Sequence, residues 1–283
     1  MATATFLQYN GKTYKADKLL ISPDNRSFRY GDGFFETIKM VKGKILLEDL
    51  HMERLFSSMD RLYFQKPSYF TPDYVKEQIL ALAKQNYHDK LGRIRLTIFR
   101  GNGGLYDPEN HFPNYIIQTW ALNPANNNLN ENGLITDIYP DARKAADQFS
   151  SIKSNNYLSY AMAALWAKKE HLNDAILLNA NNRIADSTIA NIFIVQNGVI
   201  KTPPLTEGPV SGNMRRYLLQ CLRKENMPVE ESPITAEELK QAAELFFTNA
   251  IYGIKWVKQL GNSQYSNNVS SMLHKKFIAP LFL

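Results

Sequence analysis

The sequence contains a single cysteine, Cys221, among 283 residues. One thiol excludes an internal disulfide and a metal site built from cysteines, and it favours a reducing compartment. No hydrophobic run has the length that a membrane-spanning helix needs. The first six residues lack the charged start and the long apolar run of a secretory signal. We therefore expect a cytoplasmic protein with no membrane partner and no bound metal.

The sequence also has little excess charge of either sign. Its formal net charge is +6, without a dense block of lysine and arginine, and 44% hydrophobic with 21% charged residues is ordinary for a globular protein. A mild preference for small anionic molecules fits this charge as well as nucleic acid does, and we expect no nucleic-acid partner. A chain of this length can bury a large core, as one big domain or as two of ordinary size.

The stretch 123–132 marks the clearest boundary in the chain. It reads Asn-Pro-Ala-Asn-Asn-Asn-Leu-Asn-Glu-Asn, a composition that is typical of an exposed linker. We therefore predict a smaller N-terminal α/β domain over 1–122, a linker over 123–132 and a larger C-terminal domain over 133–283.

The first domain is predicted to combine strands with two helices. Asn10-Gly11 supplies the turn of a hairpin over 6–14. One helix is expected from about Glu48, and a second begins at Thr71-Pro72-Asp73, where an N-cap precedes a proline. Apolar and polar residues alternate over 92–100, as in a half-buried strand.

Two features of this domain have a structural and a functional interpretation. Gly31-Asp32-Gly33 allows a tight turn into a strand, in which we interpret Phe34 as a core residue. Two small residues and a carboxylate beside two aromatic residues would also suit the wall of a pocket. His51 and Arg54 are three residues apart on the predicted helix, so they share a face and can converge on one ligand. The ordinary expectation for such a pair is an exposed position. The planar fork of Arg54 could instead clamp a phosphate.

The second domain contains a lysine at a loop–helix junction. Lys153 lies in Ser151-Ile152-Lys153-Ser154-Asn155-Asn156-Tyr157, just ahead of an alanine-rich helix predicted over 158–169. A lysine amine loses its proton more easily when it is partly desolvated, and a Schiff-base lysine requires this. Most lysines are solvated surface charges, so the sequence around Lys153 must support such a role.

Two further features could accompany this lysine. Asp186 lies in a predicted loop, where an aspartate usually bonds nearby backbone amides; buried near Lys153, it could hold a proton on a heterocyclic nitrogen. Gly212 opens a helix, and the free amides of a helix start favour an anion.

Together these motifs resemble the fold type IV enzymes that use pyridoxal 5'-phosphate (PLP), also called class IV aminotransferases. The matching stretches occur in the family's order along most of the chain. They are Tyr30 to Thr37 (YGDGFFET), Leu50 to Leu55 (LHMERL), Ile152-Lys153-Ser154, Asp186 to Phe193, Thr202 to Leu205 (TPPL) and Gly212 to Arg215 (GNMR).

The resemblance implies a two-domain α/β (α+β) subunit of the D-amino-acid aminotransferase type. It implies that Lys153 forms the Schiff base with PLP and moves the proton at the substrate α-carbon. Arg54 would bind the cofactor phosphate, together with the backbone amides of Asn213 and Met214, and Asn249 would contact the cofactor. The family further implies a cofactor at the domain interface and a homodimer whose partner contributes to the pocket.

The resemblance also assigns Asp186 and Val210. Asp186 would face the pyridine nitrogen and keep it protonated, so that the ring acts as an electron sink, and Val210 would pack against the ring. The family usually has glutamate where this chain has Asp186, in a pattern that ends at Asn191. A carboxylate one methylene shorter must sit closer or act through a water. Aminotransferases also commonly have Ile/Val-Thr in place of Asn213-Met214.

Three activities of the superfamily compete. D-amino-acid aminotransferases have an Arg-x-His pair before Phe-Pro, where this chain has Glu109-Asn110-His111-Phe112-Pro113. Branched-chain aminotransferases tend to have Gly-Gly-Asn-Tyr after the lysine, where this chain has the shorter Ser154-Asn155-Asn156-Tyr157. The third activity is that of the 4-amino-4-deoxychorismate lyases, which release pyruvate and leave p-aminobenzoate for folate synthesis.

The lyases are the interpretation that we favour. The glycine-rich loop Arg100 to Tyr106 is similar to the lyase loop, apart from one missing glycine, and GNMR at Gly212 and Thr248-Asn249-Ala250 are similar as well. Thr37 would then assist catalysis, with Arg100 or Lys39 as the partner of a substrate carboxylate. Phe35, Arg100, Tyr106 and Ala250 are the expected substrate-binding residues. The alternatives are an aminotransferase for branched-chain or D-amino acids and a protein that binds PLP with little turnover.

Overall fold

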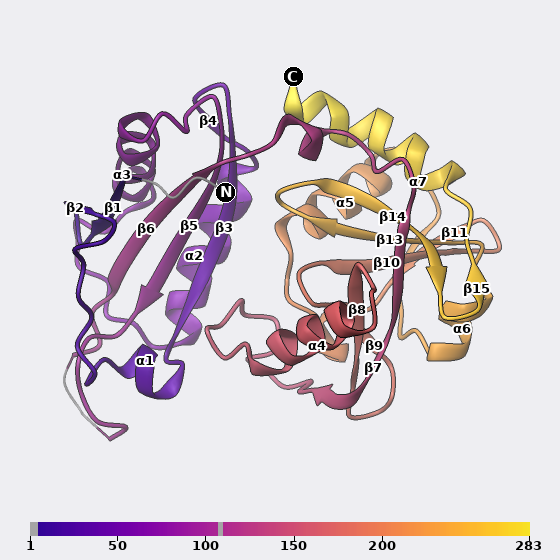
Figure 1. Ribbon diagram of the computed structural model, residues 1–283, viewed down its shortest axis with the longest axis horizontal. Helices are drawn as coiled ribbons and strands as arrows, with labels where there is room; N and C mark the ends of the chain where they lie inside the picture. The colour runs from indigo at the N-terminus through magenta and orange to yellow at the C-terminus, as the bar shows by residue number, and fades with distance from the viewer. Residues whose placement is uncertain (1–4, 107–109) are drawn as a thin grey trace. The chain divides into compact units, whose positions relative to one another are not determined.

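The computed structural model describes residues 5–106 and 110–283. The chain forms two compact units (Figure 1). Unit 1 comprises residues 1–124 together with Lys153–Asn156, and unit 2 comprises 125–152 and 157–283. The segment Lys153–Asn156 thus belongs to unit 1, although its neighbours in sequence on both sides belong to unit 2. The predicted limits at 122 and 133 stay a prediction.

Unit 1 contains one antiparallel sheet with the strand order β2-β1-β6-β5-β3-β4. Its strands are β1 (Phe6–Tyr9), β2 (Lys12–Lys15), β3 (Gly33–Val41), β4 (Lys44–Ile45), β5 (Leu91–Phe99) and β6 (Asn114–Ala121). The predicted hairpin is confirmed, because Asn10 and Gly11 connect β1 to β2 with φ of 47° and 79°. These left-handed conformations suit an Asn-Gly turn.

Helices cover one face of this sheet. They include α2 (Glu48–Arg61), which contacts β3, and α3 (Pro72–Gln85), which contacts β1, β5 and β6; the short α1 (Arg26–Tyr30) precedes β3 (Figure 1). Thr71 caps α3 as predicted, by accepting a hydrogen bond from the Tyr74 amide. Leu55 and Met59 of α2 are buried, whereas Leu62 lies just beyond its end and is only half-buried.

The two faces of this sheet have different chemistry. Register pairs Phe34 with Ile98 and Ile38 with Ile94 on the helix-covered face, where all four side chains are at most 1% exposed. Alternation places every second residue of β3 and β5 on the other face. That face carries Phe35, Thr37, Lys39, Arg93, Arg95 and Thr97. The hydrophobic face therefore forms the core, and a row of polar and cationic side chains lies opposite.

Unit 2 is built on a nine-stranded sheet. Its strands are β7 (Leu134–Lys144), β8 (Asp174–Asn179), β9 (Ile184–Ser187), β10 (Asn191–Gln196), β11 (Val199–Thr202), β12 (Val229–Glu231), β13 (Glu244–Asn249), β14 (Gly253–Leu260) and β15 (Ser263–Gln264). The order is β12-β11-β10-β13-β14-β7-β8-β9, with β15 beside β14. A short turn joins the terminal strand β9 to β10 near the other end, so the sheet curls.

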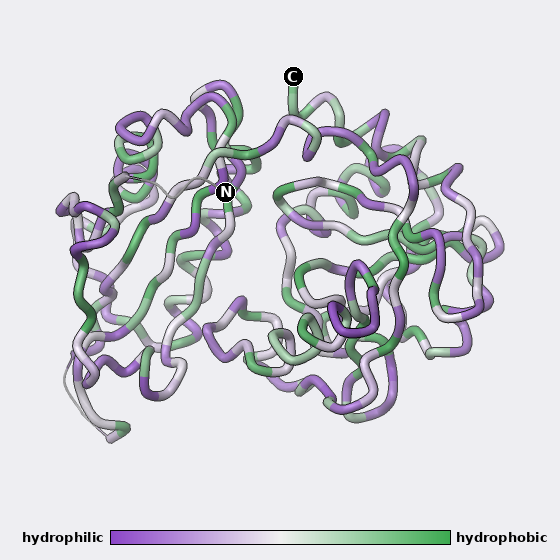
Figure 2. Tube along the Cα trace, viewed as in Figure 1, coloured by the Kyte–Doolittle hydropathy of each residue, from purple (hydrophilic) through white to green (hydrophobic). Residues whose placement is uncertain are grey.

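Buried apolar side chains of the central strands form the core of this unit. Ile192, Ile194, Leu245 and Phe247 of β10 and β13 are fully buried. Figure 2 shows hydrophobic residues along these strands and hydrophilic residues in many of the connecting turns. The helices of unit 2 are α4 (Leu158–Lys169), α5 (Asn213–Lys224), α6 (Ala236–Gln241) and α7 (Asn268–Leu273).

The predicted helix after Lys153 is confirmed at 158–169. Asp186 was expected in a loop, and this expectation is wrong: it lies on β9 and is 2% exposed. The reason is that β9 is only four residues long and follows the turn after β8 closely, so the sequence shows no separate strand pattern.

Within residues 5–106 and 110–283, no helix combines the length and the hydrophobicity needed to cross a membrane. The same residues contain no cluster of three or more His, Cys, Asp or Glu side chains suited to a metal ion. The cytoplasmic location stays a prediction.

Candidate active site

Lys153 is held by the edge of strand β3. The Phe35 amide donates to the Lys153 carbonyl at 2.9 Å, and the Asn155 amide donates to the Gly33 carbonyl at 2.8 Å. These bonds surround an antiparallel bridge between Phe34 and Ser154. The lysine backbone is therefore positioned by strand pairing, five residues before α4 begins.

The lysine amine lies over an aromatic ring. The Nζ atom of Lys153 is 4.6 Å from the centroid of the Phe35 ring, and the guanidinium carbon of Arg95 is 3.7 Å from the same centroid. Both cations interact favourably with the ring face. Thr37 lies on the same sheet face as Phe35, two residues along β3, and pairs with Arg95 in the register. The structure thus brings Lys153, Phe35 and Thr37 to one face of β3.

Lys39 continues this row and is 0% exposed. Burial lowers the pKa of Lys39 to about 7, because the charged ammonium loses its hydration. In the register it lies opposite Arg93 on β5. Lys39 can therefore change its charge near neutral pH, and a substrate carboxylate beside it would favour the charged form.

Arg54 and His51 converge on a carboxylate of the protein. Arg54 donates to Glu36 through Nε at 2.7 Å and Nη2 at 2.5 Å, and His51 Nδ1 lies 2.7 Å from Glu36 Oε2. The expectation that this pair is exposed is wrong: His51 is 1% and Arg54 7% exposed. The cause is Glu36, which points to the helix-covered face and pairs with them there.

The pKa of Glu36 reflects this environment. Burial alone raises it, but the charge of Arg54 and the hydrogen bonds from His51 and Arg54 outweigh burial and lower the pKa to about 2. The carboxylate therefore stays ionised and orients the guanidinium of Arg54. The role of Arg54 at a phosphate stays a prediction.

Arg100 lies in a buried network at the end of β5. It donates to Asp32 Oδ1 at 2.6 Å, to His111 Nδ1 at 3.2 Å and to the carbonyl of Leu62, and it is 6% exposed. These contacts fix the glycine-flanked turn at Asp32 before β3. The role of Arg100 toward substrate stays a prediction.

The structure does not describe residues 107–109, which follow the predicted substrate-binding residue Tyr106. Tyr106 is 93% exposed at the end of the glycine-rich loop, and its role toward substrate stays a prediction. Glu109, which replaces the arginine of the D-amino-acid aminotransferases, lies outside the described residues.

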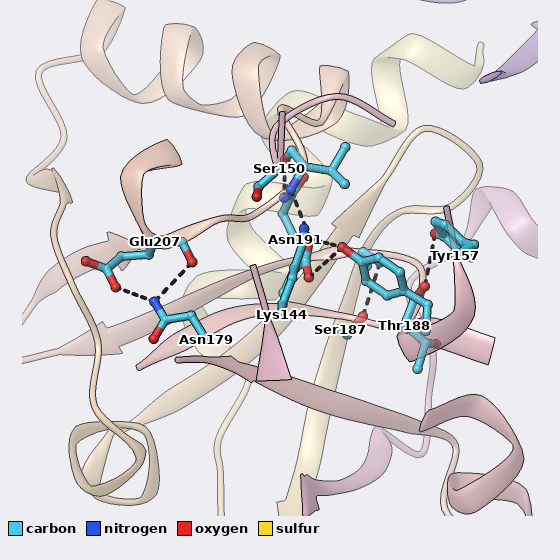
Figure 3. Close-up of polar contacts among 12 residues, drawn as sticks. Lys144, Ser150, Tyr157, Asn179, Ser187, Thr188, Asn191 and Glu207 are labelled. Atoms are coloured by element: carbon cyan, nitrogen blue, oxygen red, sulfur yellow. Dashed lines mark hydrogen bonds and ion pairs between the residues drawn. The ribbon is translucent and has the colours of Figure 1, made fainter. Parts of the chain in front are cut away.

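Unit 2 surrounds Asp186 with hydrogen-bond donors. Lys144 Nζ lies 3.1 Å from Asp186 Oδ2, the Tyr160 hydroxyl lies 3.1 Å from both carboxylate oxygens, and the Val210 amide donates to Oδ2 at 2.9 Å. Figure 3 shows the Lys144 side chain among these polar contacts. The contacts come from β7, from α4 and from the segment before α5. The carboxylate is consequently fixed in position.

The start of α5 is fixed by the same region. Asn191 donates from Nδ2 to the Val210 carbonyl at 2.7 Å, so Asp186 and Asn191 hold both sides of this residue. Gly212 is the N-cap of α5 and has no side chain that could bond the amides of the first turn. Amides at a helix start, here those of Asn213 and Met214, favour an anion.

Asn249 and Ala250 follow β13 in a turn. The Oδ1 atom of Asn249 accepts from the amides of Ile251 and Tyr252 at 2.9 and 3.1 Å, and Nδ2 lies 3.4 Å from the Ile189 carbonyl. Ile189 follows Asp186 by three residues, so this turn lies close to the β9–β10 connection. The roles of Asn249 and Ala250 stay predictions.

Sequence reasoning missed three residues that this geometry brings forward. Strand alternation places Glu36 on the same sheet face as Phe34, the predicted core residue, but alternation alone does not show that His51 and Arg54 face it. Lys144 and Tyr160 gave no such signal, because each reaches Asp186 from a distant part of the chain.

Comparison with known proteins identifies the family. A model of the class IV amino-transferases matches residues 33–260. The chain belongs to this family. It is 29% identical over 276 residues to a Methanocaldococcus jannaschii protein provisionally named a branched-chain-amino-acid aminotransferase, covering 95% of this chain and 93% of the relative. It is 28% identical over 233 residues to the aminodeoxychorismate lyase of Vibrio harveyi, covering 81% and 83%.

Solved structures support the fold. The branched-chain aminotransferase of Thermoproteus uzoniensis, solved with norvaline, has a TM-score of 0.87 and 22% identity, covering 99% of this chain and 95% of that one. A second branched-chain amino acid aminotransferase, solved with N-(5'-phosphopyridoxyl)-L-glutamate, has the same TM-score of 0.87 and 20% identity, covering 100% and 95%. The expected fold type IV architecture is confirmed.

The family also bears on the chemistry. Its members act as PLP-dependent aminotransferases or lyases, so the expected cofactor and an enzymatic activity are confirmed by the family. D-alanine aminotransferases match this chain as well. The names of the relatives therefore leave the reaction open.

The donors and acceptors of this chain fit PLP. An ionised carboxylate has about four lone-pair sites, and Asp186 receives three donors from the described residues. One more donor, such as a protonated ring nitrogen, can bond at Oδ1, where Tyr160 is the one donor that the described residues supply. The first turn of α5 offers amides for a phosphate, and Lys153 offers an amine for the aldehyde.

The Glu36 cluster leads to a prediction about acid stability. The pKa of Glu36 in the folded protein, about 2, lies below its ordinary value of 4.5. Its stabilising contribution is therefore complete above pH 4.5 and is lost as the pH falls toward 2. We expect the variant Glu36→Gln to unfold at lower urea concentration than the parent at about pH 7, with a difference that shrinks between about pH 5 and pH 3.

The exposed Glu77 of α3 provides the control for this measurement. Glu77→Gln is expected to leave the urea midpoint nearly unchanged at both ends of the range. A difference between Glu36→Gln and the parent that stays constant down to about pH 3 would contradict the assigned pKa.

Proposed function

We propose that this enzyme is a 4-amino-4-deoxychorismate lyase, which produces p-aminobenzoate for folate synthesis. The observation that carries the proposal is the presence of the Thr37 hydroxyl on the sheet face of β3 that also carries Phe35, over whose ring the Lys153 amine lies. A second proton-transferring group suits an elimination, in which a proton leaves one carbon and an oxygen leaves the next. The GNMR motif at Gly212 supports the same choice.

The proposed reaction needs no further reactant. The proton on the carbon that bears the amine is removed, and the bond from the neighbouring carbon to the enolpyruvyl oxygen breaks. The ring becomes aromatic, and the released enol takes up a proton to give pyruvate. Bound PLP would stabilise the negative charge that develops on the amine-bearing carbon.

The residues of the chain divide the remaining tasks. Lys153 would hold the cofactor and, as a free amine, remove the proton. Thr37 would donate a proton toward the leaving oxygen. Lys39 is the better candidate for a substrate carboxylate than Arg100, because it lies on the sheet face of Thr37, while Arg100 bonds Asp32 and the Leu62 carbonyl. The amides of Asn213 and Met214, with Arg54, would bind the phosphate.

The product assay decides the reaction. Incubation of the PLP-loaded protein with aminodeoxychorismate is expected to give pyruvate and p-aminobenzoate in equal amounts. Lys153→Ala should lose the visible absorbance of bound PLP and this activity, because the Schiff base requires the lysine amine. Transfer of an amino group from glutamate to branched-chain 2-oxo acids or to pyruvate, without p-aminobenzoate, would instead identify an aminotransferase. PLP absorbance without either activity would indicate a binding protein with little turnover.

Thr37 provides a sharper test of the elimination. Thr37→Val keeps the shape of the side chain and removes its hydroxyl, so we expect kcat for p-aminobenzoate formation to fall by about 100-fold or more, the usual contribution of a positioned acid or base. Thr37→Ser restores a hydroxyl and should recover most of the rate. The visible absorbance of bound PLP serves as the control for folding. Equal rates for Thr37→Val and the parent would exclude a role for the hydroxyl.

We also propose that the enzyme is a homodimer. Supporting this, Leu158, Met162 and Leu165 form an exposed row on α4, at 71%, 44% and 60% exposure. Their spacing places them on one helix face, and exposed apolar patches often mark protein interfaces.

The proposed interface can be tested by measuring mass in solution. Leu165→Glu is expected to shift the protein from dimer to monomer in light scattering after size-exclusion chromatography, because a buried unpaired carboxylate opposes association. Ala164→Glu, an exposed position outside this row, is the matched control and should remain a dimer. A Leu165→Glu dimer as stable as the parent would show that this face is not the interface.

A further inference from the structure

Asp186 lies in a buried ion pair. Its relative exposure is 2%, and that of Lys144, whose Nζ is 3.1 Å from Oδ2, is 8%. The two opposite charges cancel within this cluster. Removing only one partner of such a buried pair strongly destabilises the protein, because the other charge is left uncompensated.

Lys144 is placed for this contact by the end of its strand. It is the last residue of β7, paired with Asn179 of β8, and its Nζ lies 5.1 Å from the Tyr160 ring centroid. The pKa of Lys144 is lowered, because burial outweighs the charge of Asp186, its hydrogen bond and the smaller effect of Asp147, all of which raise it. The desolvated ammonium thus depends on one carboxylate above all.

Tyr160 and the Val210 amide complete the environment of Asp186. Burial and the adjacent Asp186 charge raise the pKa of Tyr160 well above its ordinary value, so its hydroxyl keeps its proton and donates to the carboxylate. Both are neutral donors. Lys144 is therefore the positive charge that the described residues bring into contact with Asp186.

We propose that Lys144 is a positioning residue that competes with the ring nitrogen of PLP for the charge of Asp186. Lys144 keeps the short aspartate side chain in place through the ion pair. The same ion pair reduces the attraction between Asp186 and a proton on the ring nitrogen, because a like charge nearby opposes the protonated form. This inference rests on the PLP site of the proposed function, and it holds for a lyase and for an aminotransferase alike.

The ammonium of Lys144 and a protonated ring nitrogen can therefore replace one another as the positive charge beside Asp186. When the charge of Lys144 is removed, Asp186 is left buried with neutral donors only. A protonated ring nitrogen can then supply the missing positive charge. In a variant without the charge of Lys144, the ring nitrogen should therefore contribute more to the affinity for PLP than it does in the parent.

Binding of two cofactor forms isolates this effect. The probes are PLP and its 1-deaza analogue, in which carbon replaces the ring nitrogen, and the measured quantity is the ratio of their dissociation constants. In Lys144→Met the preference for PLP over the analogue is expected to rise by about tenfold or more, the equivalent of one unit in the pKa of the ring nitrogen. Lys144→Arg keeps the charge and should retain the parent ratio.

Two further measurements separate positioning from a structural role. In the Asp186→Asn background the substitution Lys144→Met should change the ratio much less than in the parent, because the carboxylate for which the two cations compete is absent. Thermal unfolding provides a second readout: PLP should raise the melting temperature of Lys144→Met by more than that of the parent, while the analogue should not.

The outcomes are distinct. If Lys144→Met folds poorly, Lys144→Gln, which keeps a hydrogen-bond donor without the charge, replaces it in the same comparison. A parent ratio in both neutral variants would overturn the inference and leave Lys144 a structural residue. Failure of the parent protein to form p-aminobenzoate would overturn the proposed lyase reaction without affecting the ratio.

Discussion

The strand pairing that holds Lys153 is the interaction on which the candidate site depends. Two backbone hydrogen bonds fix residues 153–155 on the edge of β3 and leave the lysine amine over Phe35. The segment has little regular structure of its own, so its position comes from β3. Thr37 and Lys39 follow Phe35 on the same face of β3. One strand therefore sets the spacing between the Lys153 amine, the Thr37 hydroxyl and the Lys39 side chain. A reaction that moves protons between neighbouring atoms requires such fixed spacing.

Each unit contains a buried carboxylate that orients the polar side chains around it. Glu36 orients Arg54 and His51 in unit 1, and Asp186 bonds Lys144, Tyr160 and the Val210 amide in unit 2. Each carboxylate has a cationic partner from its own unit. A buried charge without such a partner would be strongly destabilising. Ion pairs within each unit therefore orient its polar groups. A ligand that binds these groups meets them already in position.

Much of this organisation could be predicted from local sequence. The hairpin at Asn10-Gly11, the cap at Thr71 and the helix at 158–169 follow from short-range patterns, and all three are confirmed. The family could be recognised because its motifs are contiguous stretches in a fixed order, whose match extends over residues 33–260.

What could not be predicted depends on contacts between distant residues. The burial of His51 and Arg54 depends on Glu36, 15 and 18 residues away. The surroundings of Asp186 depend on Lys144 and Tyr160, 42 and 26 residues away. Periodicity cannot reveal such pairs, since each residue satisfies its own element whether or not the partner is present. The short strand β9 was missed because its four residues are all buried and so show no alternation.

The replacement of the family's usual glutamate by Asp186 follows from these surroundings. A shorter side chain reaches less far, and Asp186 remains close to its own strand, where Lys144 and the Val210 amide bond the same oxygen. Its other oxygen meets Tyr160 alone among the described residues, so one side of the carboxylate stays suited to a further donor. The aspartate and the lysine are therefore best understood as one unit, in which the length of the acid and the position of the base together fix the carboxylate.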